Sequence, residues 1–469
     1  MKKFFSKIVA IVVTALFFNI SCLQSVNSFT ITEEREIGEK LLYSVRRAFP
    51  LMDDPDLVQY LSGLGKDVLG VSGLQYFDYR FYIIKDKEFN AFAAPSGMVF
   101  FYSGLIGSMM KEDELVSVLA HEIGHVVKRH LAGRLEKGMV INVASIAVAL
   151  ASLALGGGAA TQALMTGSLA AGQSANLHFS RKDEEEADLL AYGWMKELHR
   201  NPEGQKTMLD TMRRVSRYRS EKLPQYLLTH PNPEDRLNYV EALIEIDKEK
   251  LAVLPEKDEF EFLRFKYRIM AQSTDAFSLR EYLSSVMGDA RSAPLAKTMA
   301  RYGLSQLEMT LKNYKAATEY LNQVIADLPD KKILLTDKGV MLYLAGSYEE
   351  AKNTLELVGR QNPKDMYAAF YLAKTYLVIG DMAQAQSLFS TVSYNMPEYS
   401  KVYFELGQIA AKKGDRVTAA LFLGKYYLYE GKLDSARFSL ESVVRDKKAN
   451  AKQQEEGKLL LDTIDRLED

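Results

Sequence analysis

The last third of the chain repeats itself every 34 residues, and this period restricts its fold more than any other feature. Three residue types recur at that spacing, namely Gly346, Gly380 and Gly414; Ala317, Ala351, Ala385 and Ala419; and Pro329, Pro363 and Pro397. Small residues suit the places where paired helices cross, and proline suits the end of the second helix because it cannot continue a helix. The period predicts a stack of helix pairs over residues 295–469.

A 34-residue period of this kind is the tetratricopeptide pattern. Lys312 stands where the first unit would have glycine, and GKLDSAR from residue 431 restarts the motif early, which predicts a terminal helix shared between units. Stacked helix pairs form a concave surface that typically holds a peptide or a partner protein. The alternative is that the repeats only pack against the rest of the chain as a scaffold.

The N-terminus has the pattern of a secretory signal. In MKKFFSKIVAIVVTALFFNISC, lysines precede an apolar run over residues 8–18, which is too short for a comfortable membrane span. We expect residues 1–21 to be removed from an exported protein, with an uncleaved anchor as the alternative. Cys22, the single cysteine, lies where a bacterial lipobox would place the lipidated residue, although Asn19 departs from that pattern. Lipidation of Cys22 would anchor the mature protein to a membrane, and one cysteine allows no internal disulfide.

The stretch VLAHEIGHVVKRH carries the chemistry. Residues four apart share one face of a helix, so His121 and His125 can hold one metal ion between them. Glu122 then lies beside the metal without binding it, where a base takes a proton from water. A histidine at residue 131 would complete a metzincin site, but that residue is leucine. The pattern predicts a zinc hydrolase that needs a third ligand from elsewhere.

The acidic run SRKDEEEAD, residues 180–188, offers that ligand. Glu184 would complete a His-His-Glu set and leave one zinc position open for water. Asp188, one helical turn later, could accept the outer N–H of a ligand histidine and fix its tautomer. The alternative for such a run is a solvated helix face.

Just before this run, residues 138–180 contain no Asp, Glu, Lys or Arg, although 26% of the chain is charged. We expect small-residue helices packed beside the active site. The alternative is a surface that contacts lipid or an unfolded, apolar client. The net charge of −2 comes without any strongly basic region, and this excludes nucleic acid as a partner.

HEIGHVVKRH followed by SRxxExxAD resembles the HtpX-like and CAAX-prenyl-protease-like gluzincin metallopeptidases. Two more stretches are similar to that family, NAFAAPSGMVFFYSGL at 90–105 and LTHPNPEDRL at 228–237. The resemblance covers roughly residues 30–245. It implies one bound Zn²⁺ per chain, with His121, His125 and Glu184 as ligands and Glu122 as the catalytic base.

The resemblance also implies roles for His230 and Arg236, which match a downstream pair in the family. They would help with the substrate carbonyl or the tetrahedral intermediate, in agreement with the value of a second electrophile opposite the zinc. His230 could instead occupy the open zinc position and hold the enzyme inactive, because neutral imidazole is a good zinc ligand. The sequence leaves both roles open.

Two segments predict a small sheet. Residues 77–83 alternate as a half-buried strand does, and residues 98–104 are rich in β-forming residues after a Pro-Ser-Gly turn. In this kind of protease an edge strand near the metal can accept an extended peptide by β-augmentation. We assign that substrate strand to Met98, Val99, Phe100 and Phe101, with an ordinary buried strand as the alternative.

We therefore expect an α+β protein that is mostly α-helical. A signal (1–21) precedes a gluzincin-type metallopeptidase domain with a small sheet (30–250), a helical connector (251–294) and a tetratricopeptide solenoid (295–469). The resemblance implies a periplasmic zinc endopeptidase of a bacterium that degrades misfolded or stalled envelope proteins, with the repeats binding clients or the outer-membrane assembly machinery. The alternative is a chaperone or assembly adaptor whose zinc site is latent.

Overall fold

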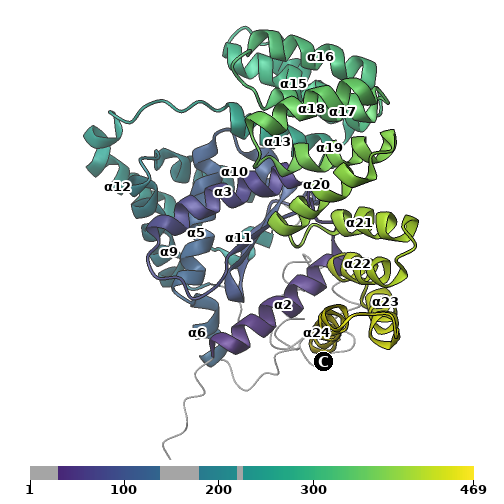
Figure 1. Ribbon diagram of the computed structural model, residues 1–469. Helices are drawn as coiled ribbons and strands as arrows, with labels where there is room; N and C mark the ends of the chain where they lie inside the picture. Colours follow the sequence, from purple (N-terminus) through teal and green to yellow (C-terminus); the bar gives the residue numbers. More distant parts are fainter. Residues whose placement is uncertain (1–29, 138–178, 219–224, 469) are drawn as a thin grey trace, which may run out of the picture.

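The structure is a computed structural model that describes residues 30–137, 179–218 and 225–468 (Figure 1). Its N-terminal half joins helices to a small sheet, and its C-terminal half is a curved stack of helices. The expected fold class, a mostly helical α+β protein with a C-terminal solenoid, is confirmed. The predicted signal, Cys22 and most of the uncharged stretch lie outside the described residues. Within the described ranges no helix is both long and apolar enough to cross a membrane.

The N-terminal half places its helices around the metal-motif helix α5. The helices are α2 (Ile31–Ala48), α3 (Pro55–Val71), α4 (Ser103–Ser108), α5 (Glu112–Val127), α6 (His130–Lys137), α9 (Arg181–Glu197), α10 (Glu203–Tyr218), α11 (Gln225–Thr229) and α12 (Pro233–Leu251). α5 packs against α9, α10 and α3. It begins with Glu112, Asp113 and Glu114, whose negative charges favour the N-terminus of a helix.

The sheet has three strands in the order β1-β3-β2. They are β1 (Arg80–Ile84), β2 (Ala91–Ala94) and β3 (Met98–Tyr102). β1 runs parallel to β3, and β2 runs antiparallel to it after a turn through the 3-10 helix η1 (Pro95–Gly97). Both sides of β3 are thus paired within the chain.

This topology makes the assignment of Met98, Val99, Phe100 and Phe101 as the substrate strand wrong. These residues form the central strand, with partners on β1 and on β2, and their side chains are buried. A strand can accept an added peptide only along an unpaired edge. The edge strands are β1 and β2, and β2 contacts the metal-motif helix α5.

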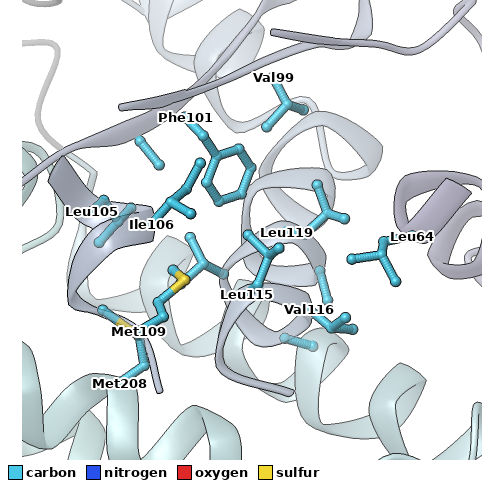
Figure 2. Packing of buried hydrophobic residues seen from close by; sticks show 14 of the residues in the cluster. Leu64, Val99, Phe101, Leu105, Ile106, Met109, Leu115, Val116, Leu119 and Met208 are labelled. Atoms are coloured by element: carbon cyan, nitrogen blue, oxygen red, sulfur yellow. The ribbon is translucent and has the colours of Figure 1, made fainter. Parts of the chain in front are cut away.

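One hydrophobic core fixes α5 beneath the sheet. Figure 2 shows Phe101 and Val99 of β3 facing Leu115, Val116 and Leu119 of α5. The side chains of all five are buried. Burial of a large apolar side chain stabilises a fold by about 1.5–3 kcal/mol. This face of α5 is thereby held to the sheet, while the opposite face carries the histidines.

The C-terminal half is an arc of antiparallel helix pairs. Its helices are α13 (Phe260–Ser273), α14 (Ala276–Gly288), α15 (Pro294–Thr310), α16 (Tyr314–Asp327), α17 (Leu334–Leu344), α18 (Tyr348–Gln361), α19 (Met366–Ile379), α20 (Met382–Asn395), α21 (Ser400–Lys412), α22 (Arg416–Tyr429), α23 (Leu433–Arg445) and α24 (Ala451–Glu468). The repeat glycines end helices with positive φ, for example 95° at Gly380. α22 packs against both α21 and α23, so it is shared between two units.

The arc is attached to the N-terminal half by buried ion pairs. Arg264 of α13 donates to both carboxylate oxygens of Asp337 on α17, at 2.8 and 2.9 Å, and also pairs with Asp56 of α3 at 2.8 Å. Arg268 pairs with Asp54 at 2.8 Å, and its guanidinium lies 4.3 Å from the centre of the Tyr367 ring. The predicted connector thus carries the cations that join the two halves. Part of the solenoid therefore packs against the N-terminal half of the same chain.

Candidate metal centre

Three elements bring four potential metal ligands together. His121 and His125 come from α5, Glu184 from α9, and His230 from the residue that follows α11. One ligand atom of each lies within 4.8 Å of every other, and all four side chains are buried. The side chain of Ser180 caps α9 and accepts from the Asp183 N–H, and this places Glu184 in the first turn.

The ring nitrogens and carboxylate oxygens of these residues face one another. The Nε2 atoms of His121 and His125 are 3.0 Å apart, and His125 Nε2 is 3.4 Å from Glu184. His230 Nδ1 lies 3.0 Å from Glu184 and 3.3 Å from His121 Nε2. His230 therefore belongs to the same group of donors as the other three.

A second layer of polar contacts orients these ligands. Asp188 lies 2.8 Å from Nδ1 of His121, on the side away from the other ligands. Arg236 donates to both oxygens of Asp188, at 2.7 and 2.8 Å, and lies 2.7 Å from Glu184. Tyr239 and Gln205 also donate to Asp188. A carboxylate bound in this way fixes the tautomer of the histidine it accepts from.

Arg236 lies beside the donor group and is bound to two carboxylates. The sequence interpretation made Arg236 part of the catalytic machinery, and its buried guanidinium is engaged with Glu184 and Asp188. Pairing with two carboxylates offsets the free-energy cost of burying this positive charge. These contacts place Arg236 where it holds the two carboxylates, and its help with the tetrahedral intermediate stays a prediction.

His130 is a contact that the sequence interpretation missed. Its Nδ1 lies 2.9 Å from Nδ1 of His125, and its Nε2 lies 3.2 Å from Glu186. His125 thus has its own outer partner, as His121 has Asp188. The only signal in the sequence is the spacing, since His130 follows His125 by five residues just beyond the end of α5.

Glu122 is set apart from the other charged residues of the site. Its side chain is fully buried, and neither carboxylate oxygen has a hydrogen-bond partner among the described residues. The nearest ring nitrogen is His230 Nε2, 3.5 Å away. A buried carboxylate without a partner is costly to keep, so its position calls for a function.

Charge keeps two carboxyl groups ionised despite their burial. Burial alone would raise the pKa of Glu184, but His230 and Arg236 hold this pKa well below its ordinary value. Burial would likewise raise the pKa of Asp188, and Arg236 and His121 lower it instead. Both groups are anionic at neutral pH, as a metal ligand and its supporting partner need to be.

The four donors have the chemistry of a zinc site. Imidazole nitrogen and carboxylate oxygen are the ligands that Zn²⁺ takes in hydrolases. Two Nε2 atoms that face each other at 3.0 Å, each with its Nδ1 engaged elsewhere, are suited to binding a cation with both lone pairs. The residues present therefore fit a zinc ion.

Comparison with known proteins supplies a family. Residues 56–244 match the model of peptidase family M48, and residues 342–406 match a tetratricopeptide repeat model. The chain carries a family M48 metallopeptidase domain. The matched range contains α5, α9 and α11 with the residue that follows it, so it includes all four residues of the donor group.

Several named proteins are similar to this chain. The chain is 28% identical to the beta-barrel assembly-enhancing protease of Escherichia coli (strain K12), over 94% of this chain and 90% of that protein. It is 32% identical to the mitochondrial metalloendopeptidase OMA1 of Schizosaccharomyces pombe, over 39% of this chain and 51% of that protein. Metalloprotease LoiP of Escherichia coli (strain K12) is 29% identical over 41% of this chain and 70% of its own length. The first similarity extends over the repeats as well as the M48 domain.

Proposed function

We propose that this protein is an exported zinc-dependent endopeptidase that hydrolyses peptide bonds of misfolded or stalled envelope proteins. The observation that carries the proposal is a group of four buried donors beside a buried carboxylate, Glu122, that has no hydrogen-bond partner among the described residues. His121, His125 and Glu184 would hold the zinc ion. Glu122 would be the catalytic base.

The chain's own residues would divide the reaction between them. A bound zinc ion supplies a Lewis acid that polarises the attacking water and the peptide carbonyl. Glu122 takes the proton of that water and later returns it to the leaving amine. Asp188 keeps His121 in the tautomer that presents Nε2, and Arg236 keeps Glu184 and Asp188 in place.

We expect the substrate to pair with the free edge of strand β2. The main-chain N–H of Tyr102 donates to the carbonyl of Asn90. Hydrogen-bonded and non-hydrogen-bonded residue pairs alternate along an antiparallel ladder, so the N–H and carbonyl of Ala93 point away from β3. Ala93 also lines a small hollow together with His125 and Phe179. A peptide added along this edge would therefore lie next to the zinc ligands.

Replacing Ala93 by proline tests this edge. The variant loses an outward N–H while the ladder bonds to β3 stay, so we expect the KM for an unfolded protein to rise about tenfold, which is worth ~1.4 kcal/mol. Steady-state kinetics on casein measure the change. Ala93→Ser keeps the N–H and serves as the control, with melting temperatures to show that both variants fold. An unchanged KM for Ala93→Pro would exclude β2 as the substrate strand.

His230 supports a self-inhibited form of the same enzyme. Its Nδ1 lies within the donor group, where it would take the position that water needs. In a self-inhibited enzyme, only the molecules whose His230 has left the zinc position would be active, about 10% or less of the total. We expect His230→Ala to make all molecules active and to cleave casein at least about tenfold faster. His199→Asn is the matched control, since His199 is exposed and its φ of 54° suits asparagine. A loss of cleavage in His230→Ala would instead assign His230 to the tetrahedral intermediate.

The relatives support the choice of substrate and compartment. The name of the beta-barrel assembly-enhancing protease points to the assembly of outer-membrane proteins, and the N-terminal signal pattern agrees with export to a periplasm, with Cys22 as a lipid anchor. The repeats would bind clients or the assembly machinery. Faster cleavage of an unfolded outer-membrane barrel protein than of its folded form would support this proposal, and equal resistance of both forms would contradict it.

The rival function is a chaperone or assembly adaptor with a latent zinc site. The position of His230 inside the donor group is the observation that favours it. The two functions differ in their response to His230→Ala. An endopeptidase cleaves casein in at least one of the two forms, whereas an adaptor cleaves it in neither and still prevents aggregation of an unfolded client.

A further inference from the structure

The sheet has a second unpaired edge, on the side away from the zinc site. β1 is the edge strand opposite β2. Segment 50–52 pairs with its far end, where the Met52 N–H donates to the Ile83 carbonyl at 2.8 Å and the Lys85 N–H donates to the Pro50 carbonyl at 2.9 Å. Because alternate residues of a strand point to opposite neighbours, the N–H and carbonyl of Phe81 face the same side as those of Ile83. In the described part of the chain, no segment outside the sheet bonds to them.

This edge opens into a cleft between the M48 domain and the repeats. The cleft has a volume of about 510 Å³, within the usual range of ligand sites. Arg80–Ile83 line it as four consecutive residues, so the main chain of β1 forms one wall. On one side lie Val58, Ser62 and Lys66, which share a face of α3 because they are spaced by four.

The repeats form the other side of the cleft and are fixed to β1. Glu398, between α20 and α21, pairs with Arg46 at 2.7 Å and with Arg80 at 2.8 Å, and it accepts from Tyr82 at 2.8 Å. The lining also includes apolar and aromatic side chains of the repeats, namely Met396, Pro397, Tyr399 and Tyr429. The wall is thus partly apolar, and the half-buried carboxylate of Glu398 holds it in position.

The charges of the cleft favour an anionic group. Its carboxylates are all engaged within the protein, since Glu398 binds the two arginines, Asp53 pairs with Lys401 at 2.8 Å, and Glu430 accepts from Ser400 at 2.6 Å. Lys66 is exposed at the rim and has no ion pair among the described residues. One positive charge is therefore free to meet a carboxylate of a ligand.

We propose that this cleft is a second polypeptide-binding site, in which an extended, apolar segment with an acidic side chain pairs with the free edge of β1 beside Phe81. The segment would continue the antiparallel pairing that residues 50–52 begin on the same edge. Its side chains would alternate between the α3 face and the repeats. The site rests on the proposed function in so far as it would hold a client whose other part reaches the zinc site along β2.

The test is binding of a fluorescent peptide to the full chain with Glu122→Gln, so that the probe stays intact. The probe is a labelled peptide of about ten residues in which valine, threonine and tyrosine alternate around one glutamate. Ser62→Tyr fills the cleft from α3, and we expect the Kd to rise at least about tenfold, as loss of one or two main-chain hydrogen bonds implies. Gly63→Tyr is the matched control, because a Cβ atom there would meet nothing within 4 Å and Gly63 does not line the cleft.

A charge variant keeps the test valid if Ser62→Tyr folds poorly. Lys66→Glu lies on the surface, and we expect it to weaken binding of the acidic probe but not of a probe with glutamine in place of glutamate. Unchanged binding in both variants would overturn the proposal, as would a dimer that Ser62→Tyr disrupts without any peptide binding. Peptide binding with no cleavage of casein by the unmodified chain would refute the proposed function alone. Cleavage without cleft binding would refute this inference alone.

Discussion

Glu122→Gln is expected to lower the rate of casein cleavage by about 10²–10⁴-fold, the usual contribution of a positioned general base. The amide has nearly the same shape as the carboxylate but cannot accept the proton of the attacking water. Both oxygens of Glu122 lack a hydrogen-bond partner among the described residues, so the substitution breaks no hydrogen bond between those residues. The measurement is the steady-state cleavage rate, together with the metal content of both proteins.

The zinc content of a variant shows whether the substituted residue is a zinc ligand or the catalytic base. We expect Glu122→Gln to retain its zinc, because the four donors are other residues. Glu185→Gln is the matched control, since Glu185 is exposed on α9 next to Glu184, and its activity should equal that of the unmodified chain. Full activity of Glu122→Gln would rule out Glu122 as the base.

Asp337→Ala is expected to destabilise the folded chain by about 3–5 kcal/mol, because it leaves buried guanidinium groups with too little negative charge. Asp337 accepts two hydrogen bonds from Arg264 and one from Tyr302 at 3.1 Å, and its side chain is buried. The charge of Asp56 would remain as the partner of Arg264. The measurement is urea unfolding followed by circular dichroism.

Lys338→Ala provides the control for this experiment. Lys338 is the next residue along α17 and forms no ion pair within the described ranges, so its loss should change the free energy of unfolding by less than about 0.5 kcal/mol. A two-step unfolding curve for Asp337→Ala would show that the network couples the repeats to the M48 domain. A free energy of unfolding equal to that of the unmodified chain would contradict the structural role of the network.

The sequence predicts the local features of this molecule well, because they depend on short-range patterns. The spacing of His121 and His125 fixes them on one helix face, and the repeat glycines and prolines mark helix ends regardless of what the helices pack against. The acidic run predicts a carboxylate ligand at Glu184, and the structure places Glu184 beside the two histidines.

The features that the sequence did not predict depend on contacts between distant segments. The strand order is one example, since FDYRFYI and MVFFYSG show where strands form but not which of them lies at the centre. The short strand β2 has little alternation of its own and becomes an edge only through pairing with β3. The attachment of the repeats depends on Arg264 and Glu398, which look like ordinary surface charges until their partners are known.

The central claim is that the four-donor site holds a zinc ion which the chain uses to cleave polypeptides. The most direct test measures metal content and casein cleavage in one preparation of the mature protein, before and after chelation. We predict one zinc ion per chain, loss of zinc and of cleavage together on chelation, and return of cleavage when zinc is restored. A protein that binds no metal, or that cleaves casein equally well after its metal is removed, would contradict the account.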